Sequence, residues 1–228
     1  ARMRSTPASA SGSRGAGAAV CTHYSKRAQA ACKGLAPDLR RLAWLDMDRQ
    51  EGQEYWAAMQ LMGRYAAANH ELIHRHIAAH LGAQVLLDIE NHHNFAWREQ
   101  HAGRDVVVHR KGATPAGKGV MGIIPGSMAS PAYVVRGKGN PDSLESVSHG
   151  AGRCISRRQA KKILSWGEAN KLLQENKVKV LSAGLDEVPA VYKDIDQVMA
   201  CQQELAEILG QFSPRLVKMA PAGERPED

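Results

Sequence analysis

The six residues Ser148-His149-Gly150-Ala151-Gly152-Arg153 are more informative than any other stretch of this chain. One histidine lies among small residues, and an arginine follows it four positions later. Glycine lets the backbone approach a ligand closely, and arginine holds a phosphate through its planar guanidinium. Since an imidazole can attack phosphorus and form a covalent N–P bond, His149 is a candidate nucleophile. The alternative is a glycine turn that happens to contain a histidine.

A second run, Asn91-His92-His93-Asn94, contains two adjacent histidines. Neutral imidazole is a common ligand of divalent transition metals. Because successive side chains of a strand point to opposite faces, we expect only one of the pair to be a ligand. The nearby acids Asp88 and Glu90 leave open another interpretation, a metal-dependent phosphoesterase that uses His92 or His93.

Two further runs lie between these histidines and the Ser148–Arg153 stretch. In Arg110-Lys111-Gly112-Ala113, a lysine at the end of a valine-rich strand is a candidate phosphate contact. In Gly122-Ile123-Ile124-Pro125-Gly126-Ser127-Met128, a tight turn offers backbone N–H groups and a hydroxyl, which can form an anion-binding nest. Arg153 and Arg157 would share a helix face and clamp phosphates if a helix began near Gly152.

Composition fits a globular protein of one or two domains with anionic partners. The chain has 228 residues, an apolar fraction of 43% and a net charge of +7. The four cysteines are scattered, which predicts reduced, intracellular thiols. No apolar run reaches the roughly 18 residues of a membrane span, and the start lacks the apolar region of a signal peptide. We therefore expect a cytoplasmic protein with no membrane partner.

The residue pattern predicts an α+β fold, with a β-rich centre flanked by helices. Residues 1–18 are expected to be a disordered or truncated start, and residues 222–228 a tail. The His70/His74 and His76/His80 pairs have a zinc-binding spacing but no HExxH, so they predict a solvated helix face. The expected strands are 85–89, 105–109, 120–124, 132–136 and 178–181. The expected helices are 19–33, 53–81, a segment from Ser156, one capped by Ser165-Trp166-Gly167-Glu168, and an amphipathic helix over 194–210 that begins at Asp194.

In their order along the chain, these runs resemble the RtcB family of RNA-splicing ligases. The resemblance extends over about residues 11–219 and includes Ser156-Arg157 and Pro189-Ala190-Val191-Tyr192-Lys193-Asp194-Ile195-Asp196. It implies that residues 19–221 are the C-terminal part of an RtcB-like catalytic domain. The implied activity joins RNA ends that bear a 3′-phosphate (or 2′,3′-cyclic phosphate) and a 5′-hydroxyl. It uses GTP and Mn²⁺ and passes through a histidine–GMP intermediate, with RNA such as tRNA halves as the partner.

The resemblance also implies roles for individual residues. His149 would be the nucleophile that takes GMP, His93 a manganese ligand, and Asn94 a neighbour of the nucleotide. Three cations would stabilise phosphates: Lys111, Arg153 and Arg157. The guanylate site would be lined by Pro125, Gly126, Ser127, Met128, Gly150, Ala151 and Gly152, with Tyr192 near the guanine and Lys218 as the candidate for the family's C-terminal lysine.

The sequence departs from the family pattern near its start. The metal-binding cysteine and the Gly-Asn-His motif that the family carries earlier are absent, and alanine, Ala10, stands at a position where the family has a metal histidine. These departures give the alternative of a truncated, catalytically impaired nucleotide- or RNA-binding remnant. They also suggest an N-terminal half or an activating protein as a partner.

Overall fold

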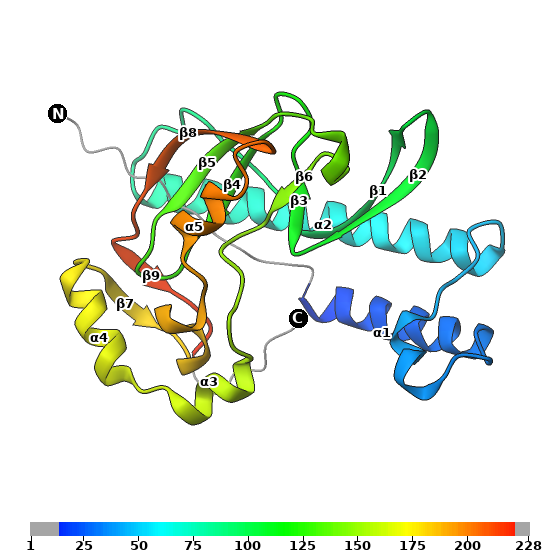
Figure 1. Cartoon of the computed structure of the whole chain (residues 1–228), viewed down its shortest axis with the longest axis horizontal. Helices are drawn as coiled ribbons and strands as arrows, with labels where there is room; N and C mark the ends of the chain where they lie inside the picture. The colour runs from blue at the N-terminus through cyan, green and yellow to red at the C-terminus, as the bar shows by residue number, and fades with distance from the viewer. Residues whose placement is uncertain (1–13, 222–228) are drawn as a thin grey trace. The chain divides into compact units, whose positions relative to one another are not determined.

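The computed structural model describes residues 14–221, which form two compact units that divide between Leu86 and Leu87 (Figure 1). Helices and strands are mixed, which confirms the α+β prediction. Ala10, most of the expected disordered start and the expected tail lie outside the described residues. Residues 14–18, the last part of that expected start, are helical. Alanine favours helix, and this helix packs against a second one.

Unit 1, residues 14–86, consists of helices. They are α1 (Arg14–Ala31), the 3-10 helix η1 (Pro37–Leu42) and α2 (Gln50–His80). The predicted helices over 19–33 and 53–81 are thus confirmed. The rings of Tyr24 on α1 and Tyr55 on α2 lie 5.1 Å apart. Among the described residues, no helix combines the length and the apolar character needed to cross a bilayer.

Unit 2, residues 87–221, contains all the strands of the described chain. They are β1 (Asn94–His101), β2 (Arg104–Lys111), β3 (Ala113–Pro115), β4 (Met121–Pro125), β5 (Ala132–Gly137), β6 (Ser146–Ser148), β7 (Lys179–Ser182), β8 (Ala206–Phe212) and β9 (Leu216–Lys218). The pairs β1–β2 and β3–β6 and the sheet β4–β5–β8 are antiparallel, whereas β7–β9 is parallel. The strands predicted over 105–109, 120–124, 132–136 and 178–181 correspond to β2, β4, β5 and β7.

The helices of unit 2 are short, and a polar residue precedes each of the three α-helices. They are α3 (Arg157–Ile163), α4 (Trp166–Glu175), α5 (Ile195–Ala200) and the 3-10 turns η2 (Pro141–Ser143), η3 (Leu185–Glu187) and η4 (Pro189–Val191). Ser156 caps α3 by accepting a hydrogen bond from the backbone N–H of Gln159, and Asp194 caps α5. Ser165 lies at the start of α4 as predicted, but its side chain makes no capping bond.

Two predicted elements are wrong. The helix expected over 194–210 ends at Ala200, and residues 206–212 form β8, because pairing with β5 outweighs the helical spacing of the apolar residues. The strand expected over 85–89 is irregular, with Val85 62% exposed and Leu86 69% exposed. The helix expected from Ser156 is confirmed as α3, whereas residues 152–155 are not helical, since they pair with the segment around Tyr192.

Two apolar clusters form the core of unit 2. The first joins the β4–β5 sheet to α5 and β6 through Ile124, Val135, Val147, Ile195 and Met199, among others. The second joins α3 and α4 to η3 and η4 through Ala160, Ala169, Val188 and Val191. Tyr192 packs against both clusters, so the segment that follows η4 connects the two parts of the core.

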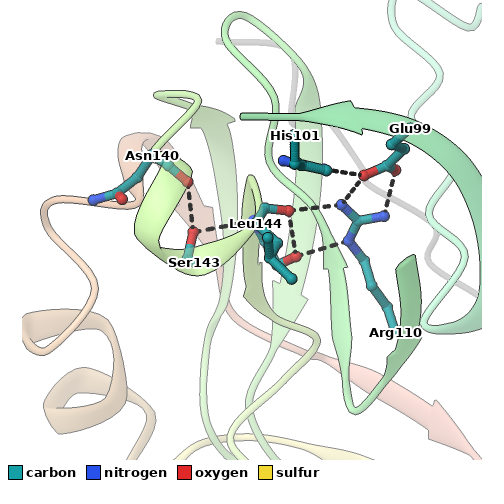
Figure 2. Close-up of polar contacts among 7 residues, drawn as sticks. Glu99, His101, Arg110, Asn140, Ser143 and Leu144 are labelled. Carbon is teal, nitrogen blue, oxygen red and sulfur yellow. Dashed lines mark hydrogen bonds and ion pairs between the residues drawn. The ribbon is translucent and has the colours of Figure 1, made fainter. Parts of the chain in front are cut away.

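A buried ion pair ties β1 to β2 (Figure 2). Arg110 is 3% exposed and donates to both carboxylate oxygens of Glu99, at 2.6 and 2.9 Å. It also donates to the carbonyl oxygen of Leu144 and to Oγ of Ser146, each at 2.8 Å, and its guanidinium lies 5.0 Å from the centroid of the Trp97 ring. The hydrogen bonds from Arg110 lower the pKa of Glu99. Arg110 therefore has a structural role and holds the end of β2 in place.

Candidate functional site

Two histidines face each other at the end of β2. The ring centroids of His93 and His149 are 5.3 Å apart, and their planes differ by 18°. Gly112 holds both backbones, because its N–H donates to the carbonyl of His93 (3.1 Å) and its carbonyl accepts from the N–H of His149 (3.4 Å). Its φ of +75° is a conformation that favours glycine, and a Cβ there would lie 3.7 Å from Nδ1 of His149. The structure thus brings together the two histidines that the sequence singled out.

Asn91 anchors the segment that carries His93. Its Nδ2 donates to Oγ1 of Thr114 at 3.0 Å, and its Oδ1 accepts from the N–H of Ile123 at 3.0 Å. A Cβ on Gly122 would come within 2.8 Å of Nδ2 of Asn91, so glycine leaves room for this side chain. No role was predicted for Asn91, since nothing in its immediate neighbours indicates two partners more than 20 residues away.

The loop after His149 is held from two sides. The N–H of Ala151 donates to the carbonyl of Pro125 at 3.0 Å, and a Cβ on Gly150 would lie 3.1 Å from the same oxygen. On the other side, the N–H of Ser148 donates to Oε1 of Gln202 at 2.6 Å, and Gln202 is only 8% exposed. The Pro125 turn and the His149 loop are therefore in contact, as the resemblance implies. Gln202 is a positioning residue that the sequence did not reveal.

The Gly126–Met128 turn uses its polar groups internally. The N–H of Gly126 donates to the carbonyl of Pro131 at 3.0 Å, and the hydroxyls of Ser127 and Ser130 are 2.8 Å apart. Met128 is 2% exposed, so its side chain belongs to the interior. The turn places Pro125 in contact with the His149 loop. An anion bound in the expected nest would have to compete with these internal hydrogen bonds for the same polar groups.

The imidazole of His149 has one buried, unpaired nitrogen. The residue is half-buried, and its Nδ1 is enclosed without a hydrogen-bond partner among the described residues. Buried polar atoms in folded proteins almost always have a partner, so an exception calls for an explanation such as a catalytic role or a bound water or ion. This ring is therefore the strongest candidate for chemistry in unit 2.

Arg153 and Arg157 share the carboxylate of Glu187, and both also contact Asp186, Arg157 at its carboxylate and Arg153 at its backbone carbonyl. Nη1 of Arg157 lies 3.2 Å from Oδ2 of Asp186 and also pairs with Glu187. Nη1 of Arg153 is buried without a hydrogen bond and reaches Glu187 only as a 3.5 Å ion pair, while its Nη2 donates to the carbonyl of Asp186 at 2.5 Å. A phosphate would have to compete with these two acids, which the sequence did not single out.

Tyr192 belongs to the same network. Its hydroxyl donates to Glu187, and the guanidinium of Arg153 lies 5.4 Å from the centroid of its ring. Burial, followed by the hydrogen bond to Glu187, raises the pKa of Tyr192. The N–H of Lys193 donates to the carbonyl of Gly152 at 3.0 Å, so this segment runs beside the end of the His149 loop.

The remaining predicted site residues lie at two places. Asn94 and Lys111 are exposed partners in the register of β1 and β2, next to His93 and Gly112. Lys218 is exposed in β9, where it pairs with Ser182 of β7. Asn94 and Lys111 thus belong to the histidine neighbourhood, whereas Lys218 lies on a different sheet.

The two adjacent histidines point to different neighbours. His92 lies 3.9 Å from Oε1 of Glu90 and 5.4 Å, between ring centroids, from Phe95, while His93 faces His149. Within residues 14–221, no group of three or more His, Cys, Asp or Glu side chains is placed to hold a metal ion. The donors present in this part of the chain therefore do not make up a complete manganese site by themselves.

Comparison with known proteins gives one consistent result. The family model described as tRNA-splicing ligase RtcB matches residues 8–219. The RNA-splicing ligase RtcB of Escherichia coli K12 is 36% identical over 212 residues, which are 87% of this chain and 52% of that protein. The tRNA-splicing ligase RtcB of Methanococcus maripaludis is 34% identical, over 93% of this chain and 50% of that protein. The RNA-splicing ligase RtcB of Mycobacterium tuberculosis is 34% identical, over 85% of this chain and 51% of that protein. The chain spans about half the length of the curated relatives it matches.

Proposed function

We propose that this chain, which belongs to the tRNA-splicing ligase RtcB family, carries the nucleotide-transfer residues of an RNA ligase. The ligase would join an RNA 3′-phosphate or 2′,3′-cyclic phosphate to a 5′-hydroxyl, with GTP as the source of a guanylate. The observation that carries the proposal is the His149 ring. It is half-buried, faces His93, and lies on a loop held by Gly112, Pro125 and Gln202.

The ring geometry supports a specific nucleophilic atom. Nδ1 of His149 is enclosed, which leaves Nε2 as the nitrogen that meets a ligand. In the proposed step, the Nε2 lone pair attacks the α-phosphorus of GTP while the ring proton stays on Nδ1. An N–P bond forms, the bond between the α-phosphorus and the bridging oxygen breaks, and pyrophosphate leaves. The hydrogen bonds that pin the loop fix the direction of the ring before attack.

Lys111 and Asn94 are the side chains best placed to assist. Both are exposed beside the two histidines, and neither is committed to an ion pair within the described residues. We propose that the Lys111 ammonium stabilises phosphate charge there. Arg153 and Arg157 would contribute only after Asp186 or Glu187 releases them.

Manganese is part of the proposal only through His93. The metal would supply charge neutralisation at the phosphates, and His93 is the residue we propose as one of its ligands. Since the described residues do not complete a metal site, further ligands would have to come from outside them.

A second candidate function is nucleotide or RNA binding without adduct formation. What favours it is the pairing of both Arg153 and Arg157 with carboxylates, which leaves the developing charge less compensated. The two candidates differ in whether a covalent guanylate appears.

The test is incubation with α-labelled GTP and Mn²⁺, with and without the segment of the Escherichia coli relative that this chain does not cover. The ligase proposal predicts an acid-labile, base-stable protein adduct in at least one condition. The adduct should vanish in His149→Ala and persist in the matched variant His92→Ala. Label that survives His149→Ala, or no label in either condition, would refute the proposal.

A further inference from the structure

The short helix α3 carries an excess of positive charge. Four of its seven residues are cations, namely Arg157, Arg158, Lys161 and Lys162. The helix is anchored by Ala160, which is fully buried in the second core cluster. Two of the cations, Arg157 and Lys161, turn toward Asp186, at 3.2 and 3.6 Å. The carboxylates of η3 thus neutralise the two cations on one side of the helix.

The other two cations, Arg158 and Lys162, form what we call the α3 basic face. They are four residues apart, so they lie on one side of the helix, and both are exposed. Neither makes an ion pair with another described residue. Like charges at this spacing repel each other, although the helix dipole favours Lys162 in the last turn of α3. A polyanion on this face would relieve the repulsion.

The chain length between His149 and α3 sets an upper limit on how far the α3 basic face lies from His149. An extended segment leads from β6 to α3 within unit 2 (Figure 1). The nine residues from His149 to Arg158 span at most about 30 Å. A nucleic-acid duplex rises about 3.4 Å per step, so about nine nucleotides would cover that distance.

We propose that the α3 basic face binds the phosphate backbone of the RNA strand whose end lies at His149. This inference rests on the proposed function, which makes RNA the substrate. The arginines closer to His149 are already paired with Asp186 and Glu187, whereas Arg158 and Lys162 can exchange solvent counterions for RNA phosphates without breaking a protein contact.

The test measures how RNA affinity depends on salt. Binding of a fluorescent single-stranded RNA of about 20 nucleotides, long enough to exceed the about 30 Å span, is followed by anisotropy. Each phosphate contact adds about 0.7 to the slope of log K against log salt, so Arg158→Gln/Lys162→Gln should lower the slope by about 1.4. Between about 50 and 200 mM salt, the unmodified chain should then lose about sevenfold more affinity than the variant.

The matched control is Arg104→Gln/Lys118→Gln, which removes two exposed cations of unit 2, one at the start of β2 and one in the turn before β4, and should leave the slope unchanged. Helix content by circular dichroism checks that each variant is folded. An unchanged slope in the α3 variant, an equal drop in the control, or no measurable RNA binding would overturn the inference. Polyglutamate that competes as well as RNA of equal charge would also overturn it in favour of an acidic protein partner.

GTP labelling separates this inference from the proposed function. The α3 variant should keep the labelling of the unmodified chain, because α3 lies outside the His149 loop. If the α3 variant lowers the salt slope of RNA binding but no protein is labelled by GTP, the ligase proposal is contradicted and the RNA-binding role of the α3 basic face is supported. If the protein is labelled but the α3 variant leaves the salt slope unchanged, the ligase proposal is supported and the RNA-binding role of the α3 basic face is contradicted.

Discussion

Replacing Arg110 with methionine should strongly destabilise unit 2. The Arg110 side chain is 2% exposed, that of Glu99 is 24% exposed, and four hydrogen bonds leave the guanidinium (Figure 2). Removing one partner of a buried ion pair costs about 3–5 kcal/mol, and here the Glu99 carboxylate would keep, among the described residues, only its 2.8 Å contact with Nε2 of His101. At a urea slope of about 2 kcal/mol per M, the unfolding midpoint should fall by about 2 M.

Urea unfolding followed by tryptophan fluorescence measures this loss. The matched control is Arg104→Met, at an exposed position of the same strand, and it should change the free energy of unfolding by less than about 0.5 kcal/mol. The double variant Glu99→Gln/Arg110→Met should lose less than the sum of the two single variants, since it removes both charges of the pair together. A loss below about 1 kcal/mol in Arg110→Met would refute the buried pair as the element that joins β1 to β2.

The remaining predictions concern packing, positioning and pH. Asn91→Ala should cost about 1–3 kcal/mol of unfolding free energy in urea titrations, since it leaves two partners without a hydrogen bond. Gly137→Ala should destabilise by about 1–3 kcal/mol, because its Cβ would lie 2.3 Å from a backbone oxygen, whereas Gly210→Ala, with nothing within 4 Å, should cost far less. The hydrogen bond to Asp196 raises the pKa of Tyr133 to about 12 from an ordinary 10.0. The stability contributed by the Tyr133–Asp196 hydrogen bond should therefore be complete below pH 10 and be lost as the pH rises toward 12. Tyr133→Phe should lack this pH dependence when the free energy of unfolding is measured at each pH. An equal pH dependence in both proteins would contradict the assignment.

Local patterns were enough to predict most elements. The helix period over residues 53–81 and the valine-rich stretch of β2 were read correctly, because their neighbours in sequence also decide their burial. The segment 194–210 was misread because its apolar residues fit a helix, yet β8 pairs with β5, which lies about 70 residues earlier. The residues within a segment do not show which distant strand it will pair with, so such pairing cannot be predicted from local sequence patterns.

The candidate site shows the same division. His149, His93 and the Pro125 turn were found by residue type and order, and the structure places them in contact. Asn91 and Gln202 were given no role, since each acts through hydrogen bonds to distant backbone or side-chain atoms. Asp186 and Glu187 were also missed, although they decide whether Arg153 and Arg157 are free to meet a phosphate.

The most direct measurement locates the guanylate on the protein. After incubation with GTP and Mn²⁺, in the presence of the segment of the Escherichia coli relative that this chain does not cover, the protein is digested under alkaline conditions and the adduct is mapped by fragmentation mass spectrometry. We predict a single guanylate on the imidazole of His149. A guanylate carried by Lys111 or by any other residue, with His149 unmodified, would contradict the assignment of this ring as the nucleophile.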